Sequence, residues 1–428
     1  MIIPENREKV KRKVLRLINK ADADLKIPEK KFLLEMVMGM LMSGSSNVTE
    51  IARLLCERIS IKQTLKRLSN MLLHDNLLDV CNKLCLSESY SRIDDNTVLA
   101  LDGGDVSHQY GSSFEHIANV LDGSSNEIRS GYWLNQVSGY NPVSRETFPL
   151  LLDIYSTKES GFKSSNIESF GLVSKIHEKV GNKGLWVMDR GYDRGEVLRY
   201  FLDRSLHFMM RINDTRSIYV RGKRKIIKEV AYKINRRLQF GNYGKFGKLR
   251  CELSINGKKY EATIICYKDR RNKEPMLLLT NGWIKSAKEI KRRIRGYFRR
   301  WGVEESYRFE KQGFGVEKSI VRNYKRTKTL IGITLLSWLL LVKINESPKL
   351  KEKVLKEARM EKNKRKQRPK FIYYRLLKGV QNMFKGINEL FRFRWKRRKK
   401  NKYRKSIVRL CPLFPEKANQ LGWLEVMT

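Results

Sequence analysis

The segment TVLALDGGD, residues 97–105, is a run of β-branched and aliphatic side chains that ends in acids and glycines. Such a run predicts a buried strand followed by a turn. A second segment of this kind, GLWVMDRGY at residues 184–192, predicts another buried strand. The two strands end in Asp102 and Asp189. Open α/β sheets form their sites at the carboxyl ends of buried strands, so these two acids are candidates for a common site.

Each of these acids has a neighbouring aspartate that could take its place, Asp105 for Asp102 and Asp193 for Asp189. A single aspartate after a strand more often forms a turn or caps a helix. Asp102 is preferred to Asp105 because it directly follows the apolar run. Two such acids on separate strands favour the functional interpretation.

The segments around these strands predict a mixed α/β sheet covered by helices. Strand-like runs come first, and strands and helices then alternate from about residue 166. Residues 217–280 are again strand-rich, and Asn256-Gly257 lies where a two-residue hairpin turn is expected. We therefore predict a helical, DNA-binding unit in residues 1–90, an α/β core in 91–215 and 286–345, a β-rich insertion in 216–285, and a basic, mostly helical region in 346–428.

The charge of the chain indicates its partner. There are 89 Lys and Arg residues against 45 Asp and Glu, a formal net charge of +44, and the sequence pI is about 10.1. This excess favours nucleic acid over an anionic membrane or an acidic protein. The longest apolar run, residues 329–342, is short for a membrane span and predicts a buried helix. Six cysteines without metal-site spacing are consistent with a reducing cytoplasm.

Residues 49–71 have the outline of a helix-turn-helix, with a break near Ser60. The second helix carries Lys62, Lys66 and Arg67, which we predict to contact DNA. An ordinary helical hairpin has the same pattern, so this prediction depends mainly on the charge.

The segment YFRRWGVEESYRFEK, residues 297–311, places two adjacent glutamates in a basic helix that is predicted to run on from about Ser286. At 100° per residue, one narrow face of this helix carries Tyr297, Arg300, Glu304 and Lys311. Glu305 is turned a further 100° away. The face could be a solvated stripe of weak ion pairs, but such a stripe gives no reason for Tyr297.

Three acids in a polycation suggest metal ions. Two divalent cations can hold the attacking and leaving oxygens of a phosphoryl displacement. Mg²⁺ or Mn²⁺ prefers oxygen ligands, which Asp102, Asp189 and Glu304 would supply. Arg300 and Lys311 then suit phosphate contacts, Arg as a bidentate fork and Lys as a point charge.

These segments resemble the DDE transposases of bacterial insertion sequences, in the subgroup with a Tyr-Arg-Glu-Lys signature. The signature is Tyr, two residues, Arg, three residues, Glu, six residues and Lys, and Tyr297, Arg300, Glu304 and Lys311 match it without a gap. The resemblance covers residues 96–344. It implies a ribonuclease H-like core interrupted by the β-rich insertion, with Asp102, Asp189 and Glu304 as the catalytic, metal-binding acids.

The resemblance also implies an activity. Members of the family cut both strands at the ends of a mobile element and join the 3′ ends to target DNA, generally as dimers. Tyr297, Arg300 and Lys311 would contact the element's end, and Trp283 is a candidate for stacking a flipped base. We therefore expect a Mg²⁺- or Mn²⁺-dependent transposase, a homodimer on double-stranded DNA, in the bacterial cytoplasm at the nucleoid and not at a membrane.

Two other functions fit some of these features. A ribonuclease H-like nuclease or junction resolvase would share the metal-binding acids without joining strands. A non-catalytic DNA-binding protein derived from a transposase would share the basic charge.

Overall fold

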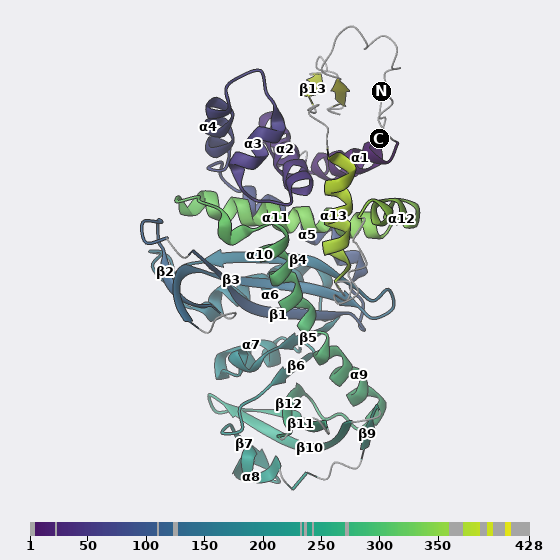
Figure 1. Cartoon of the computed structure of the whole chain (residues 1–428). Helices are drawn as coiled ribbons and strands as arrows, with labels where there is room; N and C mark the ends of the chain where they lie inside the picture. The colour runs from purple at the N-terminus through teal and green to yellow at the C-terminus, as the bar shows by residue number, and fades with distance from the viewer. Residues whose placement is uncertain are drawn as a thin grey trace, which may run out of the picture.

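The computed structural model describes residues 5–385 except 22–23, 109–110, 123–126, 232, 235–237, 242–243, 270–273 and 359–370. After residue 385 it describes two short strands, at residues 392–396 and 407–411. A mixed sheet forms the middle of the molecule (Figure 1). The N-terminal helices lie on one side of this sheet, and the β-rich segment continues it on the other (Figure 1).

The central sheet contains the two predicted acid-bearing strands side by side. Its strands are β1 (Val98–Ser107), β3 (Glu127–Asn141), β4 (Glu146–Tyr155), β5 (Leu185–Met188) and β6 (Phe208–Arg211). They follow the order β4-β3-β1-β5-β6, in which β1 is antiparallel to β3 and parallel to β5. The short β2 (Ala118–Asp122) pairs with the start of β3. The mixed α/β sheet predicted from the sequence is thus observed.

The helices that cover the sheet begin and end at residues suited to these positions. The Ser164 hydroxyl accepts a hydrogen bond from the Ile167 N–H at the start of α6, and Gly181 ends α6 with a φ of 64°. The helices of the core are α6 (Ser165–Val180), α7 (Gly195–Asp203), α9 (Ala287–Phe298), α10 (Trp301–Gly313) and α11 (Tyr324–Asn345). Short 3₁₀ turns are η1 (Tyr90–Arg92), η2 (Arg190–Tyr192) and η3 (Val316–Lys318).

The predicted continuous helix through residues 297–311 is wrong. The chain forms two helices, α9 and α10, separated at Arg299 and Arg300. The N–H groups of Arg299, Arg300 and Gly302 each donate to the carbonyl three residues earlier, which tightens the backbone. The angle of 100° per residue therefore does not carry from Tyr297 to Glu304.

The β-rich segment is an extension of the central sheet. It contains β7 (Ser217–Val220), β8 (Lys223–Ile226), α8 (Ile227–Ala231), β9 (Leu238–Phe240), β10 (Gly244–Ile255), β11 (Lys258–Asp269) and β12 (Met276–Asn281). The predicted hairpin turn is confirmed, because Asn256 and Gly257 join β10 to β11 with φ angles of 50° and 79°. β12 pairs with β6, so the segment is held to the core by a strand ladder.

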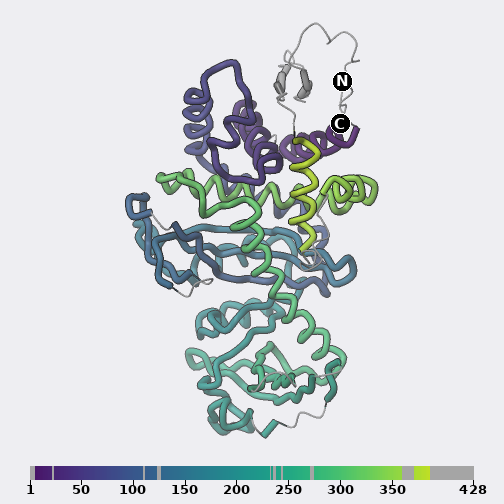
Figure 2. Tube along the Cα trace, in the orientation of Figure 1, coloured from purple at the N-terminus to yellow at the C-terminus, as the bar shows by residue number. Residues whose placement is uncertain are grey.

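Among the described residues, five helices precede the sheet and two follow the core. They are α1 (Glu5–Asn19), α2 (Ile27–Ser43), α3 (Val48–Leu55), α4 (Ile61–Met71), α5 (Leu77–Ser89), α12 (Pro348–Glu357) and α13 (Ile372–Phe384). The two groups pack together (Figure 2), and the Arg7 Nε donates to the Met383 carbonyl at 2.6 Å. A further strand pair, β13 (Arg392–Lys396) and β14 (Ile407–Cys411), lies in the basic tail. Most of that tail, and the basic run at 362–370, lie outside the described residues.

The apolar helix α11 lies between the N-terminal helices and the sheet (Figure 1). In the described part of the chain it is the one helix long and apolar enough to cross a membrane by length and composition, and 89% of its apolar window is buried. The predicted buried helix at residues 329–342 is therefore confirmed.

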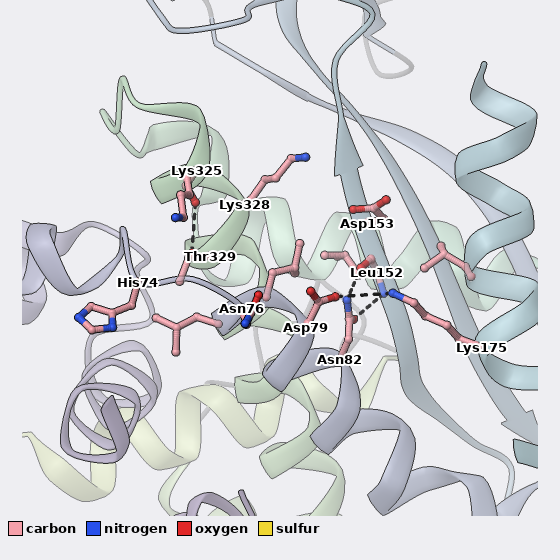
Figure 3. Close-up of a pocket in the computed structure, with 13 residues that line it drawn as sticks. His74, Asn76, Asp79, Asn82, Leu152, Asp153, Lys175, Lys325, Lys328 and Thr329 are labelled. Atoms are coloured by element: carbon pink, nitrogen blue, oxygen red, sulfur yellow. Dashed lines mark hydrogen bonds and ion pairs between the residues drawn. The ribbon is translucent and has the colours of Figure 1, made fainter. Parts of the chain in front are cut away.

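The outer edge of β4 is covered by a side chain of α5 (Figure 3). The Asn82 Nδ2 donates to the Leu152 carbonyl at 2.7 Å, and the Asn82 Oδ1 accepts from the Leu152 N–H at 3.0 Å. These bonds replace the strand that would otherwise pair with β4. A cavity of about 290 Å³ opens beside them, and its Lys175 and Lys328 lie 3.6 Å from Asp79 and 3.2 Å from Glu159. Beside the apolar contacts of α11, this part of the junction between α5 and the core is thus polar.

Replacing Asn82 by Leu should lower the free energy of unfolding by about 2–4 kcal/mol, because the buried N–H and carbonyl of Leu152 would both lose their partner. The measurement is urea unfolding of the purified variant. The matched control is Asn70→Leu at an exposed position of α4, which should change the free energy by less than about 0.5 kcal/mol. Equal effects of the two changes would contradict the proposed role of Asn82.

Candidate active site

One face of α10 lies on β1 and makes three polar contacts with it. Arg300, which caps α10, donates to the Asp102 carboxylate at 2.9 Å, and Lys311 donates to the Asp105 carboxylate at 2.9 Å. Between them, the Tyr307 hydroxyl donates to the Asp102 carbonyl at 2.5 Å. With Glu304, these residues follow the spacing i, i+4, i+7 and i+11, which is one stripe of a helix.

Arg300 joins two of the predicted acids. Its guanidinium donates to the Asp102 Oδ2 and also to the Glu304 Oε1, at 2.9 and 2.6 Å. Burial would lower the pKa of Arg300, but Asp102 and Glu304 together raise it. Arg300 is therefore a fixed positive charge between the two carboxylates.

Asp102 is buried beside the other two predicted acids. Burial raises the pKa of Asp102 to about 7; Arg300 opposes this rise, and Asp189 and Glu304 add to it. Asp189, at the end of β5, and Glu304, on α10, thus both act electrostatically on Asp102 of β1.

The parallel pairing of β1 with β5 places Asp189 beside Asp102. Ala100 pairs with Val187, and each aspartate follows two residues after its paired residue. The Asp189 carboxylate accepts from the Gly191 N–H at 2.8 Å, so it also shapes the turn after β5. Asp102 and Asp189 line a common cavity of about 390 Å³, whose walls include the aromatic side chains of Trp133, Tyr155, Phe162 and Tyr192.

The two competing aspartates are bound elsewhere. Asp105 pairs with Lys311, which is also 3.0 Å from Glu317 in η3. Asp193 accepts from the Arg216 Nε at 2.5 Å and from the Asn213 N–H at 2.7 Å, and so it holds the chain at the start of the β-rich segment. Their contacts favour Asp102 and Asp189 as the acids of the site.

Glu305 points away from this site although it adjoins Glu304. Glu305 is buried and forms an ion pair with Arg308. It also lies near Tyr374 of α13, whose pKa is raised to about 12 by burial and, after it, by the charge of Glu305. The predicted difference in direction between the two glutamates is therefore observed. Tyr297 of α9 is buried and interacts with Arg300.

The three predicted DNA contacts of α4 differ in exposure. Lys62 and Lys66 are exposed on this helix, whose start is capped by Ser60 and Gln63. Arg67 instead donates to Glu35 at 2.8 Å and to Glu57 at 2.9 Å. It therefore fastens α4 to α2 and to the loop before α4.

Two buried residues of α10, Tyr307 and Glu310, were not among the residues predicted from the sequence. Tyr307 lies three residues after Glu304 and four before Lys311, and this spacing was a usable signal. Glu310 is 3% exposed, and burial raises its pKa to about 8, opposed by a hydrogen bond from Gln136. No feature of the sequence shows that Gln136, on β3, lies beside it.

A divalent cation fits the charge and the donor atoms of this site. Asp102, Asp189 and Glu304 supply the carboxylate oxygens that Mg²⁺ and Mn²⁺ prefer. Burial, and after it the charges of Asp189 and Glu304, raise the pKa of Asp102, and a bound cation would favour its ionised form. Within the described ranges, no three Asp, Glu, His or Cys side chains already form a group close enough to hold a metal, and Arg300 lies between Asp102 and Glu304.

Comparison with known proteins gives one family match. Residues 166–340 match the family described as "Transposase DDE domain". This range includes Asp189 and Glu304, begins after Asp102, and is less than half of the chain. No curated protein matches the chain in sequence.

Several solved structures show a distant likeness. The chain is 10% identical to the piggyBac transposase in a synaptic complex with hairpin DNA, with a TM-score of 0.43, over 88% of this chain and 79% of that one. Endonuclease V from Bacillus subtilis is 9% identical, with a TM-score of 0.25 over 59% and 95% of the two chains. Endonuclease V from Ciona intestinalis, in complex with DNA that contains inosine, is 11% identical, with a TM-score of 0.26 over 55% and 100%. These TM-scores are too low to indicate a function.

The buried Glu310 predicts a pH dependence of stability. In the unfolded chain this carboxyl loses its proton near pH 4.5, whereas in the folded chain it keeps the proton to about pH 8. The folded state therefore binds more protons in this window, and stability falls as the pH rises through it. Glutamine is neutral at every pH, so the Glu310→Gln variant should lack this fall. The difference in the free energy of unfolding between the variant and the wild type should therefore shift in favour of the variant by about 3–4 kcal/mol between pH 5 and pH 8.

The measurement is urea unfolding of both proteins across this pH range. Glu252→Gln, at an exposed glutamate of β10, is the matched control and should follow the wild type. A Glu310→Gln profile that also parallels the wild type would show that Glu310 is not protonated in the folded protein.

Proposed function

We propose that this protein is a DDE transposase of the Tyr-Arg-Glu-Lys type, which cuts the DNA ends of an insertion sequence and joins the 3′ ends to target DNA. The observation that carries the proposal is the link from Asp102 through Arg300 to Glu304, beside Asp189. The family match to a transposase DDE domain, which includes two of these acids, supports it. The net charge of +44 is consistent with DNA as substrate.

The core would be ribonuclease H-like. Three antiparallel strands followed by two parallel ones, in the order β4-β3-β1-β5-β6, support this assignment. The β-rich segment enters after β6 and returns to the core through β12, between Asp189 and Glu304.

Asp102, Asp189 and Glu304 would hold Mg²⁺ or Mn²⁺. When bound, such ions stabilise the attacking and leaving oxygens of a phosphoryl transfer. Arg300 pairs with two of the acids before DNA arrives, and its planar fork also suits a phosphate group. Tyr297 lies beside Arg300, and Lys311 follows on the same stripe of α10, so we propose that both contact the element's end together with Arg300.

The N-terminal helices would bind DNA outside the cleavage site. Lys62 and Lys66 are exposed on α4 and suit phosphate contacts, while Arg67 would act by holding the helix in place. We propose a homodimer assembled on DNA, in the bacterial cytoplasm.

The test is a reaction of the purified protein with DNA fragments that carry the sequences flanking its coding region, in the presence of Mg²⁺. Joined products would support a transposase. Cut products without joining would instead indicate a nuclease, and binding without cutting would indicate a non-catalytic protein.

Adjacent glutamates provide a matched pair of variants. Glu304→Gln should lower DNA cleavage by at least about 1,000-fold, because it removes a carboxylate that would hold the metal. Glu305→Gln should keep most of the activity, because Glu305 pairs with Arg308 away from Asp102. The measurement is the rate of Mg²⁺-dependent nicking by each variant, with DNA binding and melting temperature as controls for folding. An active Glu304→Gln beside an inactive Glu305→Gln would contradict the assignment.

A further inference from the structure

We infer that Tyr307 is a positioning residue that fixes Asp102 relative to Glu304; this inference rests on the proposed function. Tyr307 lies three residues after Glu304, so the two side chains leave neighbouring turns on one side of α10. The Tyr307 hydroxyl donates to the Asp102 carbonyl at 2.5 Å. This hydrogen bond therefore joins the backbone of Asp102 to α10, the helix that carries Glu304.

The surroundings of Tyr307 make this contact rigid. The tyrosine is 8% exposed, and its ring lies against Gly104, where an added Cβ would stand 3.4 Å from the ring. β1 also faces a second tyrosine, Tyr192, whose hydroxyl would lie 3.8 Å from a Cβ added at Gly103. The two tyrosines thus pack against β1 directly after Asp102.

The Tyr307 hydrogen bond differs in kind from the contacts around it, because it joins an uncharged hydroxyl to a backbone carbonyl. Such a bond does not depend on a charged partner.

This property distinguishes Tyr307 from the other two contacts between α10 and β1. Arg300 and Lys311 contact β1 through ion pairs, and both are the cations that we propose to contact phosphate. When they turn to DNA, their contacts with Asp102 and Asp105 weaken. The Tyr307 hydrogen bond is neutral and buried, so it would hold the spacing of the acids during that exchange. Displacement of a reacting group by about 1 Å can lower a rate by about 100-fold.

The decisive variant is Tyr307→Phe, which keeps the ring on Gly104 and removes only the hydroxyl. Tyr373→Phe is the matched control. Tyr373 is 1% exposed, and its hydroxyl donates to the Thr147 carbonyl at 2.6 Å, which links α13 to β4 away from the acids. Both variants lose one buried hydrogen bond from a tyrosine to a strand carbonyl.

Three quantities should be measured on the full chain. They are the cleavage rate at saturating DNA as a function of Mn²⁺ concentration, the binding of Mn²⁺ without DNA by electron paramagnetic resonance, and the melting temperature. Tyr307→Phe should lower the cleavage rate and the Mn²⁺ affinity by about 10–100-fold, with unchanged DNA affinity. Tyr373→Phe should have a similar melting temperature to Tyr307→Phe but the cleavage rate and Mn²⁺ affinity of the wild type.

Two results would overturn the inference in different ways. If the wild type cuts DNA and Tyr307→Phe cuts it with the same rate and Mn²⁺ dependence, or if both variants lose activity equally, the positioning role is wrong and the proposed function stands. If the wild type neither cuts DNA nor binds Mn²⁺, the proposed function fails, and the positioning role fails with it.

Discussion

The contact between α10 and β1 is the constraint on which the rest of the structure depends. β1 carries Asp102 and α10 carries Glu304, far apart in the chain, and the contacts of Arg300, Tyr307 and Lys311 hold the two elements together. The parallel pairing of β1 with β5 then places Asp189 at the same edge of the sheet. The long β-rich segment between β6 and α9 does not disturb this arrangement, because β12 pairs with β6 and returns the chain to the core.

Burying carboxylates near one another is unfavourable unless a cation lies among them. In this protein Arg300 has that position, since it bonds to both Asp102 and Glu304. Burial and, after it, the neighbouring acids nevertheless raise the pKa of Asp102 to about 7, so Arg300 does not offset them fully. A divalent cation bound at Asp102 would favour its ionised form. Stability of the free protein and the proposed catalysis thus place opposite demands on Asp102.

Local patterns predicted most of the fold. The apolar runs before Asp102 and Asp189 gave buried strands, and Asn256-Gly257 gave a hairpin because both residues tolerate a positive φ. The direction of Glu304 relative to Glu305 was also predictable. The interruption at Arg299 and Arg300 was not, because hydrogen bonds of the 3₁₀ type leave no clear signal in the sequence. Tyr307 and Glu310 were missed because their partners, Asp102 and Gln136, become neighbours only when the sheet is assembled.

The central claim is that Asp102, Asp189 and Glu304 form one metal site, and the most direct measurement is to map where a metal binds on the polypeptide. Fe²⁺ can replace Mg²⁺, and with ascorbate and peroxide it produces hydroxyl radicals that cut the backbone close to the bound ion. We expect cuts near residues 102, 189 and 304, suppressed by excess Mg²⁺ and absent in the Asp189→Asn variant. Cuts confined to other segments, or a pattern that Mg²⁺ does not change, would contradict the claim.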